Sequence, residues 1–129
     1  MYKNILIPVS SIFTARELIK LAIDLLTPNA QLIILNVIAV PQQLPLTLAE
    51  EGMERARNLV KEAAAVAFDH RISTRPKIVV ARSIPEVIVK EARIDRCDLI
   101  LMGSSQHAEP ESVLLGNIVD EVLRYAACD

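Results

Sequence analysis

Aromatic residues and an excess of positive charge are both lacking in this chain. Tryptophan is absent, and two tyrosines and two phenylalanines are all the aromatic residues among 129. Proteins that bind single-stranded nucleic acid stack bases on aromatic side chains, and proteins that bind duplexes present a basic surface. Because the formal net charge is −2, we predict that nucleic acid is not a partner.

Long apolar runs and patterned cysteines are also lacking. No run approaches the roughly 18 residues that a membrane-spanning helix needs, and the first residues lack the layout of a signal peptide. We therefore expect a cytoplasmic protein with no direct membrane insertion. The two cysteines, Cys97 and Cys128, have neither metal-ligand spacing nor the pattern of a disulfide framework. We expect a small buried Cys97, a free Cys128 and no metal site.

Hydrophobic residues make up 52% of the chain, enough for one core in a single domain of residues 1–129. Apolar runs predict strands at 4–9, 31–40, 77–81 and 98–102, and helical periodicity predicts helices at 14–26, 47–70, 83–94 and about 118–126. This alternation is typical of an α/β fold with an open, doubly wound parallel sheet and helices on both faces. The alternation would place another strand after the last helix, so we expect that the final strand is missing.

Two of the predicted helices carry further local signals. An apolar stripe runs along the second helix through Met53, Ala56, Val60, Ala63 and Ala67. The third helix begins with Ser83 and Glu86 at the spacing of a capping box, with Pro85 in its first turn.

The stretch after the fourth predicted strand has the parts of an anion-binding loop. Gly103 follows the strand directly, where a missing Cβ allows close approach to a ligand. Gly116 precedes Asn117, a favoured N-cap residue, and free N–H groups at a helix start attract anions. A tight turn followed by an ordinary capped helix explains the same residues, so spacing alone leaves both interpretations open.

The segments "MGSSQH" and "VLLGN", with "YKNILIPVSS" at the start of the chain, resemble the universal stress protein family. That family carries Gly-x2-Gly-x9-Gly followed by Ser or Thr after its fourth strand. The resemblance implies a UspA-like fold of the adenine nucleotide alpha hydrolase type, a part in stress response, and binding of ATP (with Mg²⁺) or AMP at the carboxyl ends of strands one and four. The nucleotide-binding residues that it implies are Pro8, Val9, Ser10, Val37, Met102, Gly103, Ser104, Gln106, His107, Gly116, Asn117 and Ile118.

Two positions depart from the family's nucleotide-binding pattern. Gln106 replaces the second glycine, and Ser10 stands where members that bind ATP usually have an aspartate. Asn117 in place of Ser or Thr is a milder change, because its amide can still donate to a phosphate. The motif is therefore degenerate, and it is similar to universal stress domains attached to transporters.

Enzymatic signatures are absent from the sequence. There is no Gly-Lys-Ser or Gly-Lys-Thr loop of an NTPase and no Gly-x-Ser-x-Gly elbow, so we predict no catalytic residues and no turnover. Two functions stay open. One is a regulatory domain with weak or modified nucleotide binding. The other is a nucleotide-free dimerisation or interaction module, as a homodimer or as a cytoplasmic domain or partner of a membrane transporter.

Overall fold

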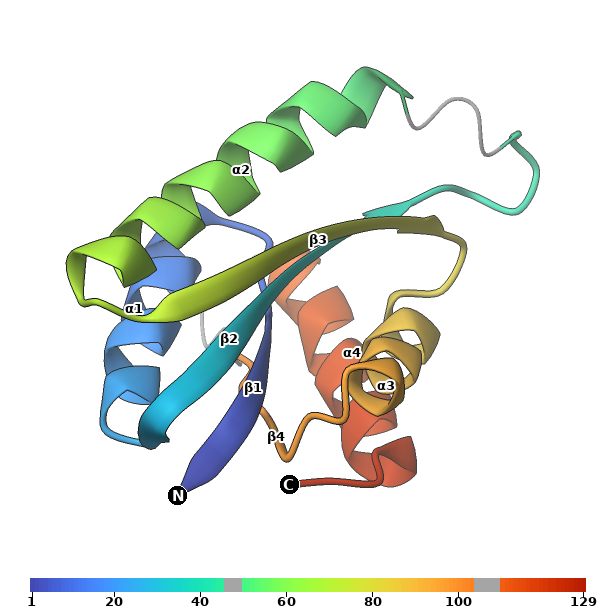
Figure 1. The fold of residues 1–129 in the computed structure, drawn as a ribbon. Helices are drawn as coiled ribbons and strands as arrows, with labels where there is room; N and C mark the ends of the chain where they lie inside the picture. Colours follow the sequence, from blue (N-terminus) through green and yellow to red (C-terminus); the bar gives the residue numbers. More distant parts are fainter. Residues whose placement is uncertain (46–49, 104–109) are drawn as a thin grey trace.

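Four strands alternate with four helices in the structure, a computed structural model that describes residues 1–45, 50–103 and 110–129 (Figure 1). The elements are β1 (Tyr2–Pro8), α1 (Ile12–Ile23), β2 (Leu26–Ala39), α2 (Glu50–Asp69), β3 (Ser73–Ala81), α3 (Ile84–Ile94), β4 (Leu99–Ile100) and α4 (Pro110–Tyr125). The strands form one parallel sheet in the order β3-β2-β1-β4. The predicted doubly wound α/β fold is therefore confirmed.

Helices cover both faces of this sheet, α1 and α2 on one side and α3 and α4 on the other (Figure 1). Successive residues of a strand point to opposite faces, so Ile5 and Ile7 pack in the core against α1 and α2, whereas Leu6 packs in the core against α3. All three are fully buried. Burial on both faces explains why β1 and β2 are almost continuously apolar in sequence.

The strand order reverses beside β1. The chain passes from β1 to β2 and β3 on one side, and then returns to place β4 on the other side of β1. Ligands in open α/β sheets bind beyond the carboxyl ends of the strands at such a reversal. The topology therefore predicts a ligand site at the segments that follow β1, β2 and β4.

The predicted apolar stripe on α2 is confirmed, but the capping box on α3 is wrong. Ser83 is the N-cap residue of α3 with extended backbone, yet its side chain makes no capping hydrogen bond. A capping hydroxyl accepts from the N–H at the second or third helical position, and Pro85 removes the first of these donors. Proline in the first turn is itself tolerated, as predicted.

The predicted start of the last helix is also wrong. Helix α4 begins at Pro110 instead of about residue 118, so Gly116 and Asn117 lie within the helix and Asn117 is not an N-cap. Proline suits a first helical turn, and one glycine in a helix interior costs only about 1 kcal/mol relative to alanine. Gly116 therefore does not stop the helix.

After α4, the chain turns back beside β4. The Ile100 N–H donates to the Asp129 carbonyl oxygen at 2.8 Å, and the Tyr2 hydroxyl donates to the Asp129 carboxylate at 3.2 Å. Among the described residues no further strand follows α4, as expected from the sequence. None of the described helices is long and apolar enough to cross a membrane.

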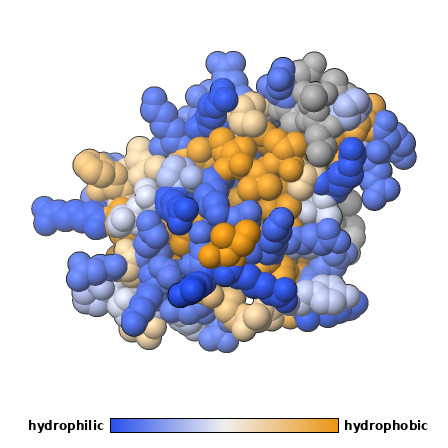
Figure 2. Space-filling model, turned by 45° about the vertical axis from the view of Figure 1, so that its right-hand side comes forward, coloured by the Kyte–Doolittle hydropathy of each residue, from blue (hydrophilic) through white to orange (hydrophobic). Residues whose placement is uncertain are grey.

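The outer surface over α3 and α4 is mixed in character. Figure 2 turns this side of the molecule forward and shows one hydrophobic patch in the upper part of the view, with smaller hydrophobic spots among hydrophilic side chains.

Candidate functional site

A cavity of about 110 Å³ lies at the carboxyl ends of β1 and β2, beside the segment that follows β4. Residues from six segments line it: Pro8, Val9, Ser10, Thr14, Leu35, Asn36, Val37, Ile84, Ile88, Met102, Gly103 and Ile118. Its walls are largely apolar, with Ser10, Thr14 and Asn36 supplying polar side chains. It is the type of shaped, mostly apolar recess that holds small ligands.

The cavity brings together seven of the predicted site residues from four separate parts of the chain. They are Pro8, Val9, Ser10, Val37, Met102, Gly103 and Ile118. Ser104, Gln106 and His107 lie outside the described residues. Gly116 and Asn117 lie on α4, and their side chains are also outside what the structure describes. The role of all twelve predicted residues in binding stays a prediction.

Asn36 organises the loop between β1 and α1. Its side-chain amide donates to the Val9 carbonyl oxygen at 2.8 Å, and the Val9 N–H donates to the Leu35 carbonyl oxygen at the same distance. These two bonds extend the β1–β2 pairing past Pro8 and hold Val9 buried while Ser10 stays exposed. The sequence reasoning missed Asn36, although a polar residue inside the apolar run of β2 was a signal for it.

Gly103 lies against the first turn of α1. A Cβ at this position would come within 2.7 Å of the Thr14 Cγ2 methyl. Thr14 has little freedom to move away, because its Oγ1 accepts from the Ser11 hydroxyl at 3.1 Å and β-branched side chains are stiff. Gly103 does not have a positive φ, so glycine is required here by this close approach.

Ser11 explains why α1 begins at Ile12, two residues earlier than the periodicity predicts. Its backbone is extended and its side chain accepts from the Thr14 N–H at 3.3 Å. This is ordinary N-capping, which satisfies one of the free donors at a helix start. The same bond ties Thr14 to the loop that carries Ser10, so the rim of the cavity is built on the capped end of α1.

A second hollow of about 250 Å³ lies at the end of β2, on the side covered by α2. Ser10, Asn36 and Val37 line both hollows. Helix α2 contributes Gly52, Arg55, Ala56 and Leu59 to the second one, which share one helical face because they are spaced by three and four residues. Arg55 places a cation near the cavity. The sequence analysis missed Arg55, although its helical spacing from Gly52, Ala56 and Leu59 was a signal that it shares their face.

The described residues include no group of three or more His, Cys, Asp or Glu that could hold a metal ion. Cys97 and Cys128 are both free and Cys97 is buried, as expected. Burial raises the pKa of the Cys97 thiol to about 12. Because the thiolate is the nucleophilic form, Cys97 is inert at neutral pH.

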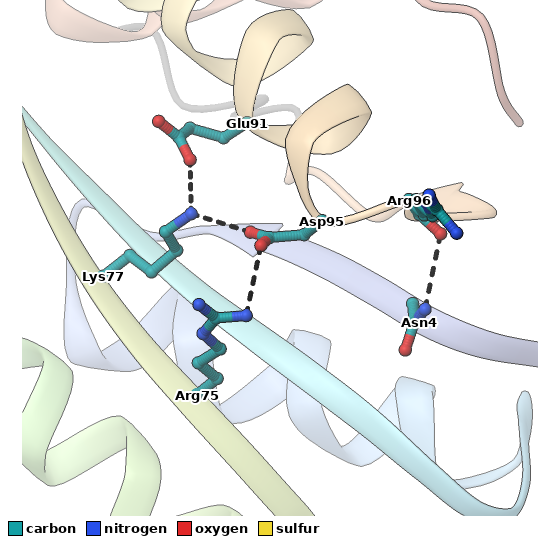
Figure 3. Close-up of polar contacts among 6 residues, drawn as sticks. All are labelled: Asn4, Arg75, Lys77, Glu91, Asp95 and Arg96. Carbon is teal, nitrogen blue, oxygen red and sulfur yellow. Dashed lines mark hydrogen bonds and ion pairs between the residues drawn. The ribbon is translucent and has the colours of Figure 1, made fainter.

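The charged groups that are best organised lie away from the cavity and join elements together (Figure 3). Lys77 on β3 contacts Glu91 on α3 and lies 2.8 Å from the Asp95 carboxylate, which Arg75 also contacts at 3.3 Å. The Asp98 carboxylate accepts from the N–H groups of Lys3 and Asn4 at 2.9 and 3.0 Å. Burial would raise the pKa of Asp98, but these hydrogen bonds outweigh it and hold that pKa below its ordinary value.

Comparison with known families agrees with this architecture. The model of the universal stress protein family matches residues 1–129. The chain belongs to the universal stress protein family. The resemblance found in the glycine stretch is thereby confirmed.

Relatives within this family and fold show how far the likeness extends. The universal stress protein MJ0577 of Methanocaldococcus jannaschii is 31% identical over 83 residues, 64% of this chain. The match spans about half, 48%, of that relative's length.

Two solved structures share the universal stress fold at lower identity. A universal stress protein of Archaeoglobus fulgidus, in complex with dAMP, is 14% identical with a TM-score of 0.74, over 98% of this chain and 94% of that one. A family member from Arabidopsis thaliana with AMP bound is 15% identical with a TM-score of 0.70, over 98% and 87% of the two chains. At these identities the likeness shows the fold.

Proposed function

We propose that this universal stress domain is a cytoplasmic regulatory domain that binds ATP or AMP weakly and without turnover. The observation that carries the proposal is the cavity at the strand-order reversal, where seven residues expected from the family resemblance line one recess. Proteins with the same fold hold dAMP and AMP, which supports an adenine nucleotide as the ligand class.

In this proposal the adenine base contacts Val37 and the Pro8–Ser10 segment, and the phosphates extend toward Gly103 and α4. The apolar walls suit the faces of a purine, and Asn36 fixes the backbone of the segment that meets the base edge. Mg²⁺ enters only as the ion that ATP carries on its phosphates, since the described residues offer no carboxylate cluster for it. In this proposal, binding shifts a conformational or assembly equilibrium instead of starting a reaction.

The size of the cavity supports weak binding. Pockets that enclose a drug-sized ligand measure about 300–1,000 Å³, whereas this one measures about 110 Å³. A whole nucleotide therefore does not fit in this cavity alone and would also occupy the adjoining hollow of about 250 Å³, which shares Ser10, Asn36 and Val37 with the cavity.

The same small volume favours a second candidate function. A domain that has lost nucleotide binding would keep the fold as an interaction module, either in a homodimer or with a membrane transporter. Ser10 and Gln106, the two departures from the nucleotide-binding pattern, support this candidate.

Isothermal titration of the full chain with Mg-ATP and with AMP separates the two functions. We expect binding in the micromolar to millimolar range, and we expect Ser10→Asp combined with Gln106→Gly to tighten it by about tenfold, or ~1.4 kcal/mol. The carboxylate gains a contact to the nucleotide, and glycine removes a side chain from the phosphate path. Ser73→Asp, an exposed change at the opposite edge of the sheet, is the matched control and leaves binding unchanged.

Two outcomes of this titration contradict the proposal. One is no heat at millimolar nucleotide for the natural chain and for the double variant. The other is strong binding that the double variant creates from none. The second outcome would assign the natural chain to the nucleotide-free class.

A further inference from the structure

The hollow of about 250 Å³ beside α2 differs in charge from the carboxyl-edge cavity that it adjoins. The polar side chains of the cavity are the uncharged Ser10, Thr14 and Asn36. The hollow adds Arg55 from α2, and none of the described residues that line it is acidic. The side of the proposed site that faces α2 therefore carries a positive charge.

Packing of α2 against the end of β2 holds Arg55 at this hollow. A Cβ on Gly52, one helical turn before Arg55, would lie 3.6 Å from the Ile38 side chain of β2. The next residue, Ala56, is only 4% exposed. Arg55 itself is exposed. The helix backbone is therefore fixed by packing, while the guanidinium group stays accessible to a ligand.

Ser10 lies at the boundary between the two hollows. It is exposed, it lines both of them, and it carries no charge. In the binding mode proposed above, the base contacts Val37 and the phosphates extend toward Gly103. The ribose joins these two parts of the nucleotide and therefore lies beside Ser10. Its hydroxyl groups are then the part of the nucleotide that faces the hollow lined by Arg55.

The charge beside a ribose decides which nucleotides a site accepts. In dinucleotide-binding folds, a carboxylate binds the free 2′-hydroxyl, whereas an arginine accommodates a 2′-phosphate. A guanidinium group binds phosphate through two parallel hydrogen bonds, and a serine hydroxyl can donate a third. A neutral Ser10 next to Arg55 corresponds to the arrangement that accepts phosphate.

We propose that Ser10 and Arg55 form a subsite for a phosphate group on the 2′ or 3′ oxygen of the ribose. The ligand class is then adenine nucleotides that carry a ribose phosphate in addition to the 5′ phosphate. This inference rests on the proposed function. It gives Ser10 a role in selecting the ligand, whereas the family comparison treats this serine only as the loss of an aspartate.

Isothermal titration of the full chain with three nucleotides tests the subsite. They are AMP, adenosine 2′,5′-bisphosphate and adenosine 3′,5′-bisphosphate. We expect one of the two bisphosphates to bind about tenfold more tightly than AMP, the size of one charge-assisted contact at an exposed site. The bisphosphate that binds better identifies the ribose oxygen that faces Arg55.

Three single variants locate the source of this preference. Arg55→Gln is expected to reduce the ratio of bisphosphate to AMP affinity to about one, because the cation is removed. Ser10→Asp is expected to weaken bisphosphate binding by about tenfold through repulsion between like charges, without weakening AMP binding. Arg57→Gln is the matched control and keeps the preference, since Arg57 is an exposed cation on α2 that does not line the hollow.

The possible failures of this proposal and of the proposed function are distinguishable. Equal affinity for AMP and both bisphosphates would overturn the subsite and leave nucleotide binding intact. A preference that survives in Arg55→Gln, or that is lost equally in Arg57→Gln, would also overturn it. A chain that binds none of the three nucleotides would contradict both the subsite and the proposed function.

Discussion

At the residue scale, Gly103 shows how a glycine can serve packing instead of backbone freedom. Its backbone does not require a positive φ, yet a Cβ would meet the Thr14 methyl at 2.7 Å. Because Thr14 is held by the capping hydroxyl of Ser11, the collision cannot be relieved by a simple rotation. Gly103 thereby fixes the distance between the segment after β4 and the start of α1, which together form one rim of the cavity.

Gly103→Ala is expected to lower the free energy of unfolding by about 1–2 kcal/mol, the usual result of forcing a methyl group into filled space. Urea denaturation measures this change. Gly52→Ala in the first turn of α2 is the matched control, since its Cβ would meet Ile38 at 3.6 Å, an ordinary contact, and no destabilisation is expected there. Equal effects of the two substitutions would contradict the packing role of Gly103.

At the residue level, local pattern identified the family but did not give the contacts that residues make across the fold. Seven residues that the resemblance implied for a nucleotide site line one cavity, and their role in binding stays a prediction. Asn36 and Arg55 were missed. The polar residue inside the apolar run of β2 and the helical spacing on α2 mark these two positions, but neither pattern shows that β2 and α2 meet the loop after β1. The partner of Gly103 could not be predicted either, since Thr14 is 89 positions away in sequence.

At the element scale, an ion-pair cluster fastens α3 to β3 at the edge of the sheet. Lys77 is the shared cation for Glu91 and Asp95, whose side chains are only 11% and 4% exposed. Burial acts to lower the pKa of Lys77, but hydrogen bonds to the two carboxylates outweigh it and raise that pKa above its ordinary value. The cluster therefore joins β3 to α3 through largely buried ion pairs, and it is not an exposed surface salt bridge.

Lys77→Met is expected to destabilise the chain by about 3 kcal/mol at neutral pH, because the largely buried Glu91 carboxylate loses its cation and Asp95 keeps only the exposed Arg75. The natural chain gains full stabilisation from Lys77 below the ordinary lysine pKa and loses it as pH rises through the raised, folded-state value. Denaturation curves across alkaline pH measure both effects. Lys61→Met, an exposed change on α2, should alter neither, and an equally small effect for Lys77→Met would contradict the cluster's role.

The elements themselves were largely predictable, whereas their boundaries were not. Apolar runs and helical periodicity located all eight elements in order. The observed start of α1 is earlier than predicted because Ser11 caps the helix. The observed start of α4 is earlier than predicted because the helix begins at Pro110 and Gly116 does not stop it. Helix α3 lacks the predicted capping box, because the Ser83 side chain makes no capping hydrogen bond although Ser83 and Glu86 have the right spacing.

At the scale of the whole molecule, the fold places two hollows along the same two helices. Ile84 at the start of α3 and Ile118 in the middle of α4 line the carboxyl-edge cavity. The outer faces of both helices form a groove of about 770 Å³, the α3–α4 groove. A ligand that moves α4 at the cavity would therefore also change the groove.

This connection gives the proposed regulation a physical route. A ligand shifts an equilibrium only by its differential affinity for two states. If nucleotide binding displaces α4 at Ile118, which lines the cavity, the outer face of that helix moves as well.

The most direct test of the account is to map nucleotide contacts on the ¹⁵N-labelled chain by NMR during titration with AMP. We predict that amide shifts concentrate at Ser10, Val37, Gly103 and Ile118, and that distant positions such as Arg71 at the end of α2 stay unchanged. Shifts confined to the α3–α4 groove, or no shifts at millimolar AMP, would contradict binding at the carboxyl ends of the strands.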